Sequence, residues 1–561
     1  MEVALQNFDR WLKNVKETEI LSDLAAIKDN FQEIEERFSE NIKFGTAGLR
    51  GIMSSGSNRM NIYTVKKATQ GLANYLNSKY KNACVAISYD CRNNSELFAH
   101  ETAAVMAANG IKSYVTSELT PTPFLSYCVR KLGAQAGVMI TASHNTAEYN
   151  GYKCYGSDGS QMNENFADEV YKYIENVDIF SDVKCMNFAN GVRSNKIEFI
   201  GKNLIDNYLN DVLSQKISGA DLKDLNVTYT PLNGTGAYFV KKIFKMAGVE
   251  NFAVVPSQEN PDGNFTTCPY PNPEIPEAFS ESLKVANENN SDIILATDPD
   301  ADRLGVCIKN GADYKILSGN EIGILLLNYI LECKSKSKTL PKRGVVVKTV
   351  VSTLAAEKIA EDYGCQVKNV LTGFKNIAYE IFELEKSGNE KDFVFGFEES
   401  NGYLCGSYVR DKDAVSAAML VCEMAAYYKN EFGLDLSHVL EKIYSKYGYF
   451  GEKTLSYEFK GILSRSKIEQ IMEFFRKSQI KNIGEFKVES VVDYLNFDGN
   501  MKSNVVQVNL ENVGKLIIRP SGTEPKIKFY VLIKSFNEDI KNYMMKNLCE
   551  FVNDFIQNIR H

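Results

Sequence analysis

Three aspartates at alternate positions form the strongest chemical signal in the sequence. They lie in Thr297-Asp298-Pro299-Asp300-Ala301-Asp302-Arg303, directly after Asp292 to Ala296, an apolar run typical of a buried strand. Carboxylates are the hard oxygen ligands that Mg²⁺ prefers. We therefore expect an extended loop that projects Asp298, Asp300 and Asp302 to one side and binds metal, beyond the carboxyl end of a strand where open α/β sheets bind ligands.

Other interpretations of this loop are weaker. An EF-hand needs Gly at its sixth position and Glu at its twelfth, where this chain has Arg303 and Lys309. A haloacid-dehalogenase-like phosphatase also carries Asp-x-Asp after a strand and uses the first aspartate as nucleophile. Its usual next Thr or Val is Asp302 here, and a third carboxylate favours metal binding. The phosphatase stays an alternative, and so does a solvated acidic turn.

A serine follows another predicted strand. The stretch Ile140-Thr141-Ala142-Ser143-His144-Asn145 is followed by Asn150-Gly151-Tyr152-Lys153. A serine at a strand end can attack or carry a phosphoryl group, and Lys153 can serve as a base or stabilise charge. A hydrolase triad is disfavoured, because the chain has no G-x-S-x-G and adjacent Ser and His side chains usually point apart. Taken alone, Ser143 fits a turn or helix cap better than a nucleophile.

Two more loops carry polar groups suited to a ligand. Arg519-Pro520-Ser521-Gly522-Thr523-Glu524-Pro525-Lys526 combines hydroxyls, backbone N–H groups and a guanidinium, which suit a phosphate, although an ordinary Gly-Pro turn would look similar. Phe395-Gly396-Phe397-Glu398-Glu399-Ser400-Asn401-Gly402 offers acidic and hydroxyl groups that could bind sugar hydroxyls. Gly234-Thr235-Gly236 lacks the third glycine of a dinucleotide fingerprint, and there is no P-loop, so nucleotide use is not supported.

Charge and composition exclude several classes of function. The net charge is −7 and no basic block of five residues occurs, which disfavours a nucleic-acid surface. The start of the chain lacks a signal-peptide pattern, so we expect a cytoplasmic protein. The apolar stretch 322–330 is too short to span a bilayer, and we expect no membrane insertion. The scattered cysteines and histidines form no zinc motif.

The elements that position these loops follow an α/β rhythm. Short runs rich in Val and Ile predict strands buried on both faces at 83–88, 137–140, 227–229, 293–296 and 344–347. Helical segments such as 97–109 and 320–331 follow them. The proline-rich stretch 256–276 predicts an ordered surface excursion. Near the end, closely spaced strands at 505–508, 515–518 and 527–533 precede a helix at 537–557, which indicates a separate α+β domain. The length suggests three or four domains.

Together the four loops resemble the α-D-phosphohexomutase superfamily, and most of all its phosphoglucomutase members. The resemblance begins at Phe44-Gly45-Thr46-Ala47-Gly48-Leu49-Arg50-Gly51 and ends at the Arg519 loop. It implies four domains around a central cleft, three related α/β domains and a C-terminal α+β domain. We expect the boundaries 1–205, 206–311, 312–445 and 446–561.

The resemblance also implies roles for single residues. Ser143 would be the phosphoserine, and its oxygen would bind Mg²⁺ together with Asp298, Asp300 and Asp302. The residues implied to act at the transfer site are Arg50, His144, Lys153, Arg303 and Lys375, of which Lys153, His144 and Lys375 compete as general base. The sugar would contact Glu398 and Ser400. The phosphate would be held by Arg519, Ser521, Gly522 and Thr523.

The implied reaction interconverts glucose 1-phosphate and glucose 6-phosphate through glucose 1,6-bisphosphate, which serves as intermediate and activator. Glu398-Glu399-Ser400 resembles the glucose-preferring form of the sugar loop. Phosphomannomutase and phosphopentomutase activities remain alternatives, as does a silent sugar-phosphate binding protein. The chain departs from the family pattern at one point. Many relatives have proline soon after Ser-His-Asn, whereas this chain has Thr146-Ala147, so the stiffness of the Ser143 loop stays open. The sequence gives no oligomeric state.

Overall fold

The computed structural model describes residues 2–45, 48–459, 464–477, 480–521 and 525–560. The chain forms two compact units. The first unit holds residues 1–316 and 402–426, and the second holds residues 317–401 and 427–561. Helix α15 (Ala414–Phe432) begins in the first unit and ends in the second.

The first sheet of the first unit has the strand order β1-β5-β4-β2-β3-β6. These strands are β1 (Leu49–Ile52), β2 (Cys84–Tyr89), β3 (Lys112–Thr116), β4 (Ala136–Ile140), β5 (Tyr149–Gly156) and β6 (Ile197–Ile200). Strand β5 runs antiparallel to both β4 and β1, whereas β4, β2, β3 and β6 are parallel. The antiparallel turn from β4 to β5 carries Ser143, and β5 itself carries Lys153.

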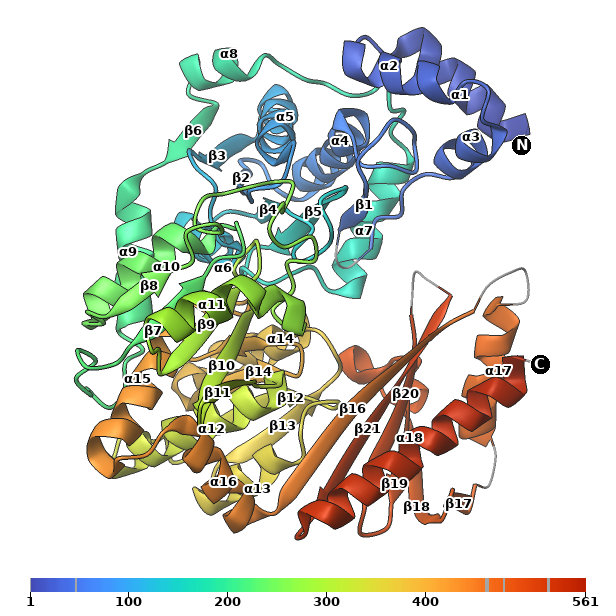
Figure 1. The fold of residues 1–561 in the computed structure, drawn as a ribbon. Coiled ribbons are helices and arrows are strands. Elements are labelled where there is room, and N and C mark those ends of the chain that lie inside the picture. Colours follow the sequence, from blue (N-terminus) through green and yellow to red (C-terminus); the bar gives the residue numbers. More distant parts are fainter. Residues whose placement is uncertain (1, 46–47, 460–463, 478–479, 522–524, 561) are drawn as a thin grey trace. The chain divides into compact units, whose positions relative to one another are not determined.

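Helices cover both faces of this sheet (Figure 1). They are α4 (Ile62–Lys79), α5 (Ser95–Ala108), α6 (Thr122–Leu132), α7 (Glu164–Glu175), α8 (Phe188–Arg193) and α9 (Lys202–Leu213). Helices α4, α5 and α7 share one apolar core with the sheet. The crossovers through α5 and α6 run in opposite directions along the sheet, so their right-handedness places α6 on the other face.

The N-terminal residues form a small helical subdomain with its own core, which the sequence analysis did not foresee. It consists of α1 (Glu2–Asn14), α2 (Thr18–Ile27) and α3 (Phe31–Phe38). Trp11 lies at its centre with edge-on contacts to Phe38 and Phe180, at ring-centroid distances of 5.7 Å each. Because Phe180 lies beyond α7, the contact fixes this subdomain to the rest of the first unit.

The second sheet of the first unit carries loop 297–303 with its three aspartates, the metal loop. Its order is β11-β10-β9-β7-β8, with strands β7 (Val227–Thr230), β8 (Phe252–Val254), β9 (Ile293–Thr297), β10 (Leu304–Asn310) and β11 (Asp313–Ile316). Helices α10 (Gly236–Ala247) and α11 (Ser280–Glu288) accompany it. Every residue of β9 is buried, as expected for a strand covered on both faces.

The second unit begins with a parallel sheet in which β12 (Val345–Thr349) lies between β13 (Gln366–Val370) and β14 (Phe393–Glu398). Its helices are α12 (Gly319–Lys336), α13 (Ala355–Asp362), α14 (Phe374–Lys386) and α16 (Leu436–Tyr447). The Glu398 loop follows β14 directly.

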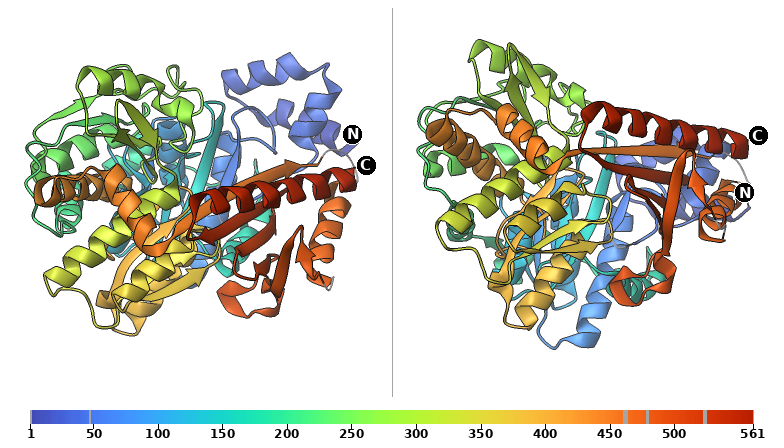
Figure 2. Two further views of the ribbon diagram at one scale, coloured as in Figure 1. Left: turned by 60° about the horizontal axis from the view of Figure 1, so that its bottom comes forward. Right: turned by 90° about the horizontal axis from the view of Figure 1, so that it is seen from below.

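The C-terminal part of the second unit is an antiparallel sheet ordered β16-β21-β20-β19-β18-β17. Its strands are β16 (Tyr449–Glu458), β17 (Asn482–Ile483), β18 (Phe486–Asp493), β19 (Val506–Leu510), β20 (Gly514–Pro520) and β21 (Lys526–Ser535). Helices α17 (Ser464–Lys477) and α18 (Glu538–Arg560) share one apolar core with this sheet, and Figure 2 shows α18 lying along it. The predicted α+β character of this region is confirmed.

The strands predicted near 83–88, 137–140, 227–229, 293–296 and 344–347 are all present as β2, β4, β7, β9 and β12. The helices predicted at 97–109 and 320–331 correspond to α5 and the longer α12. Within the described part of the chain, no helix combines the length and the apolar character needed to cross a membrane.

Candidate active site

The metal loop is a tight turn and not the extended loop expected from the sequence. After β9, the Ala301 N–H donates to the Asp298 carbonyl at 2.9 Å, and Ala301 has a left-handed φ of 47°. The turn arises because one Asp298 carboxylate oxygen accepts the N–H groups of Asp302 and Arg303, at 3.1 and 3.0 Å, which pulls the loop around itself. The side chains of Asp298, Asp300 and Asp302 nevertheless converge, as predicted.

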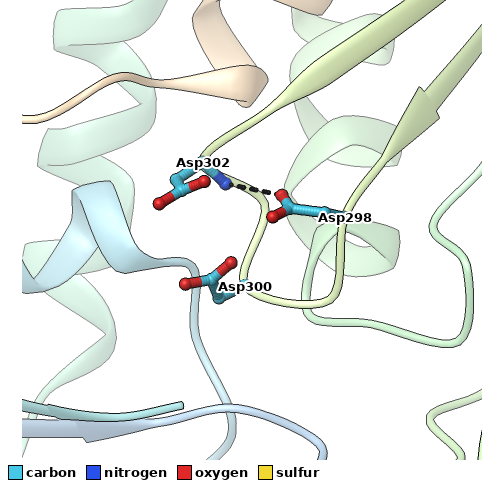
Figure 3. A group of neighbouring side chains, drawn as sticks. All are labelled: Asp298, Asp300 and Asp302. Atoms are coloured by element: carbon cyan, nitrogen blue, oxygen red, sulfur yellow. Dashed lines mark hydrogen bonds between the residues drawn. The ribbon is translucent and has the colours of Figure 1, made fainter. Parts of the chain in front are cut away.

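The three carboxylates form a buried cluster in which oxygens from all three residues lie within 4.8 Å of one another (Figure 3). Each aspartate is at most 1% exposed. One carboxylate oxygen of each, Oδ2 of Asp298 and Oδ1 of Asp300 and Asp302, has no hydrogen-bond partner among the described residues. A buried carboxylate oxygen that accepts no hydrogen bond costs free energy, which a bound cation would offset. The cluster therefore has the oxygen ligands and the unpaired negative charge that suit a cation site.

The electrostatics of the cluster are unequal. Burial and the negative charges of Asp302 and Asp300 raise the pKa of Asp298 well above its usual range. Burial also acts to raise the pKa of Asp300, but the charge and hydrogen bond of Lys153 outweigh it and lower that pKa below its usual value. Cations close to the carboxylates therefore decide how much negative charge the cluster holds.

A close backbone approach holds the metal loop against the sheet. The Thr235 N–H donates to the Pro299 carbonyl at 2.8 Å. A Cβ at Gly234 would lie 2.4 Å from Pro299 Cα, so only glycine allows this approach. The Gly234-Thr235-Gly236 stretch, which is no dinucleotide motif, thus has a packing role beside the carboxylates.

Ser143 lies on the turn between β4 and β5 and faces the carboxylate cluster. It is 4% exposed, and its Oγ donates to Asp300 Oδ2 at 3.2 Å. Its φ of 50° is left-handed, which costs a non-glycine residue on the order of 1 kcal/mol and is typical of functional turns. The strain brings the hydroxyl to the metal loop of a different sheet. Ser143 is therefore no ordinary helix-cap serine.

Basic side chains lie around the carboxylate cluster and the Ser143 turn. Lys153 extends from β5, with its Nζ 2.8 Å from Asp300 Oδ2 and 3.5 Å from Asp302 Oδ2. Arg50, on the neighbouring strand β1, donates to Asn145 Oδ1 at 3.1 Å. The Nε atom of Arg303 lies 3.9 Å from Asp302 Oδ1. The structure thus brings these predicted residues together around the cluster.

His144 is the neutral member of this group. Burial, together with the positive charges of Arg303 and Arg50, lowers the pKa of its imidazole well below the usual value. Its Nδ1 is buried and has no hydrogen-bond partner among the described residues. A neutral imidazole has an unprotonated nitrogen, but the lowered pKa makes it a weak base at neutral pH.

Two residues beside the cluster were missed by the sequence analysis. Lys412 is 7% exposed, and its Nζ lies 2.9 Å from Asp302 Oδ2. Thr122, at the N-terminus of α6, donates to Asp300 Oδ2 through its hydroxyl at 2.8 Å. The alternating charges of Arg410-Asp411-Lys412-Asp413 could have drawn attention to Lys412. Nothing in the local sequence marks Thr122.

The other predicted residues belong to the second unit. Glu398 ends β14 and is 5% exposed, and the neighbouring Glu399 accepts a hydrogen bond from Thr349 at 2.7 Å. Lys375 is the second residue of α14, Ser400 lies two residues after Glu398, and Arg519 lies near the end of β20. The Ser521 N–H donates to the Lys526 carbonyl at 2.8 Å. Gly522 and Thr523 lie outside the described residues.

Comparison with protein families accounts for most of the chain. Residues 41–179, 206–311 and 318–447 match the models for phosphoglucomutase/phosphomannomutase α/β/α domains I, II and III. The match begins after the N-terminal helical subdomain. The fold class predicted from the sequence, three α/β domains followed by an α+β domain, is confirmed.

Individual proteins show the same likeness. A phosphoglucomutase of Staphylococcus haemolyticus (strain JCSC1435) is 35% identical over 96% of this chain and 99% of its own length. A putative phosphomannomutase from Thermus thermophilus has the same fold, with a TM-score of 0.69 and 21% identity over 92% of this chain and 99% of that one. The open form of a Paramecium phosphoglucomutase, pp63/parafusin, also has this fold, with a TM-score of 0.68. It is 17% identical in sequence, and the match covers 92% of this chain and 95% of that one.

Proposed function

Because the chain belongs to the phosphoglucomutase/phosphomannomutase family, whose members are phosphosugar isomerases, we propose that it interconverts α-D-glucose 1-phosphate and glucose 6-phosphate through a phosphoryl group on Ser143. The observation that carries the proposal is the Ser143 hydroxyl, 3.2 Å from Asp300 Oδ2 within a buried three-aspartate cluster. A relative named phosphoglucomutase, 35% identical over almost the whole chain, supports glucose phosphates as substrates.

Mg²⁺ is the metal ion that we propose for the cluster. The residues fit it, because Asp298, Asp300 and Asp302 each present a buried carboxylate oxygen without a hydrogen-bond donor among the described residues. A phosphoryl oxygen on Ser143 would complete the set. When bound, the ion would supply positive charge to neutralise the transferring phosphoryl group.

In the proposed reaction, phosphorylated Ser143 gives its phosphoryl group to the free 6-hydroxyl of glucose 1-phosphate. The bond from phosphorus to Ser143 Oγ breaks as a bond to the sugar oxygen forms, and the hydroxyl proton passes to a base on the protein. The product is glucose 1,6-bisphosphate. The bisphosphate then reorients and gives its 1-phosphoryl group to Ser143 Oγ. The bond from phosphorus to the sugar O1 breaks, O1 takes the proton back from the protein, and glucose 6-phosphate leaves, so phosphate and protons are conserved over the cycle.

Three side chains compete for the role of base. His144 has an unprotonated imidazole nitrogen because its pKa is lowered, but the same shift makes it a weak base. Lys153 is ion-paired with Asp300 and suits charge stabilisation, unless the bound sugar phosphate draws it away. Lys375, in the second unit, remains a third possibility on the strength of the family resemblance.

Substrate recognition is assigned to the second unit by the same resemblance. We propose that Glu398 and Ser400 bind sugar hydroxyls. The phosphate that is not being transferred would be held by Arg519, Ser521, Gly522 and Thr523. Arginine can bind a phosphate through two parallel hydrogen bonds, which suits a group that must be held at either end of the sugar.

A coupled assay with glucose, mannose and ribose 1-phosphates tests this function. We expect the highest kcat/KM with glucose 1-phosphate, a dependence on Mg²⁺, activation by glucose 1,6-bisphosphate and no net release of inorganic phosphate. A preference for mannose or ribose 1-phosphate would favour phosphomannomutase or phosphopentomutase. Stoichiometric phosphate release would instead indicate the aspartate-nucleophile phosphatase, and binding without turnover a silent binding protein.

A further inference from the structure

The turn that carries Ser143 has few internal hydrogen bonds for a segment that holds a strained residue. The Ser143 N–H donates to Thr141 Oγ1 at 2.8 Å, and the Asn145 and Tyr149 N–H groups each donate to a carbonyl within the turn at 3.1 Å. A left-handed φ at a serine persists only where the surroundings hold it. The Thr146-Ala147 pair also lacks the proline ring that would stiffen such a turn.

One arginine from another segment supplies the missing contacts. The guanidinium of Arg92 donates to four backbone carbonyls of the turn: Nη1 to Thr146 and Tyr149, at 2.8 and 3.1 Å, and Nη2 to Ser143 and Asn145. These carbonyls span the turn from Ser143 itself to the first residue of β5. The guanidinium thus fixes the path of the backbone on both sides of the hydroxyl.

Arg92 is itself held in place. Its side chain is fully buried, and its Nε lies 3.3 Å from Asp90 Oδ2. The Phe265 ring covers it, with the guanidinium carbon 4.9 Å from the ring centroid. Phe265 belongs to the proline-rich excursion 256–276, and Asn264 next to it accepts a hydrogen bond from Asn93 at 2.8 Å. The excursion, which belongs to the second sheet of the same unit, therefore packs over Arg92.

We propose that Arg92 is a positioning residue, which holds Ser143 in its left-handed conformation and so keeps the hydroxyl aimed at the carboxylate cluster. This inference rests on the proposed phosphoserine function. Arg92 touches only backbone atoms of the serine turn and acts on the reaction through Ser143. Its role depends on geometry, because a planar guanidinium reaches four carbonyls at once whereas a lysine has a single nitrogen.

Arg92→Lys in the full-length protein tests the proposal, since it keeps the charge and removes the fork. We expect kcat to fall about 100-fold, the usual effect of a small misplacement of a reacting group, while KM changes less than about threefold. Hydrogen exchange of the amides in 141–150 should speed up with no matching change elsewhere. The control is Arg59→Lys. Arg59 is a buried arginine of the same unit that contacts Glu36 and Asn58, so its substitution should leave both kcat and the exchange of amides 141–150 unchanged.

Near-wild-type kcat in Arg92→Lys would overturn the proposal. Faster exchange spread through the whole first unit would also overturn it, because that result indicates a general structural role.

If Arg92→Lys does not fold, Phe265→Leu keeps the inference testable, because it uncovers the guanidinium without touching the turn. We expect faster exchange in 141–150 and a kcat lowered about threefold to tenfold. No change in either readout would contradict the proposal. Lack of mutase activity in the wild-type protein, in contrast, would refute the proposed function and leave the exchange result standing.

Discussion

Each unit buries a cluster of ionisable side chains, and the two clusters differ in the sign of their charge and in how that charge is compensated. The carboxylate cluster of the first unit comprises Asp298, Asp300 and Asp302 with Lys153 and Lys412. The lysine pair of the second unit comprises Lys348 on β12 and Lys515 on β20.

The carboxylate cluster has more carboxylates than lysines and keeps three oxygens without donors among the described residues. In the lysine pair, Lys348 lies 3.0 Å from Glu357, while burial and the positive charge of Lys348 lower the pKa of Lys515 to about 7. An ammonium group can relieve its burial by losing a proton. The carboxylates differ, because lysines and backbone N–H groups satisfy some of their oxygens, while the raised pKa of Asp298 reflects burial and the repulsion that remains. Under the proposed function a cation relieves this repulsion, so we expect the carboxylate cluster to bind a ligand and the lysine pair to affect stability alone.

The largest expected effect comes from removing one ligand charge in the carboxylate cluster. Asp300→Asn takes away the carboxylate that contacts Ser143, Lys153 and Thr122, and we expect kcat/KM to fall at least about 10³-fold with a matching loss of Mg²⁺ affinity. Steady-state kinetics and calorimetric Mg²⁺ titration measure both. Asp313→Asn, at an exposed carboxylate of the same sheet, is the control. Unchanged Mg²⁺ affinity in Asp300→Asn would show that the cluster is not the metal site.

The two lysines of the carboxylate cluster should differ in importance. Lys153 contacts the carboxylate that also receives the Ser143 hydroxyl, whereas Lys412 contacts Asp302 and Asp411. We expect Lys153→Met to lower kcat about 10²- to 10³-fold, in the range for acid–base or charge-stabilising groups, and Lys412→Met about tenfold. Single-turnover transfer from the phosphorylated enzyme measures the difference. Equal losses would mean that the lysines act only through total charge.

The backbone that supports the carboxylate cluster gives a smaller effect. Gly234→Ala adds a Cβ 2.4 Å from Pro299 Cα and must push the metal loop away. We expect Mg²⁺ affinity to fall about tenfold and the free energy of unfolding to drop by about 1–3 kcal/mol, as for other overpacked sites. Gly201→Ala is the matched control, because its Cβ would meet no atom within 4 Å. Wild-type affinity in Gly234→Ala would show that the loop tolerates displacement.

The lysine pair should affect stability and leave turnover largely unchanged. Lys515 has a pKa of about 7 in the folded protein against an ordinary 10.5 when unfolded, so the unfolded chain binds more protons between these values and stability rises with pH across that window. Lys515→Met should therefore raise the unfolding temperature most below pH 7. The gain should shrink above pH 7 by up to about 1.4 kcal/mol per pH unit.

Thermal unfolding between pH 6 and pH 10 measures this trend, with Lys534→Met, at an exposed lysine of β21, as the control. A gain that does not depend on pH would mean that Lys515→Met acts through added apolar contact and not through removal of a buried charge.

Much of the carboxylate cluster could be predicted from the sequence, because its ligands are local. Asp298, Asp300 and Asp302 follow one strand, Ser143 lies on the turn after another, and Lys153 lies on the strand that this turn leads into. The shape of the metal loop was predicted wrongly. Its turn depends on hydrogen bonds from backbone N–H groups to the Asp298 carboxylate, and no spacing rule reveals these.

Residues that reach the cluster from elsewhere in the chain could not be found in this way. Thr122 contacts Asp300 across 178 positions of sequence, and Arg92 braces a turn about 50 residues later. Neither stands in a motif with a chemical meaning of its own. The contact that fixes the N-terminal helical subdomain to the rest of the first unit is also long-range, because Trp11 meets Phe180 from a distant segment. Long-range packing is what a single sequence conceals.

The most direct test of the account is the phosphorylation state of Ser143. Intact-mass analysis of the wild-type protein after incubation with glucose 1,6-bisphosphate and Mg²⁺ should show a species heavier by one phosphoryl group, and peptide mapping should place it on Ser143. That species should persist while added glucose 1-phosphate is converted to glucose 6-phosphate, because each cycle returns a phosphoryl group to Ser143. Ser143→Ala should lack both the phosphorylated species and mutase activity. If Ser143→Ala interconverts the two glucose phosphates at close to the wild-type rate, Ser143 is not the phosphoryl carrier.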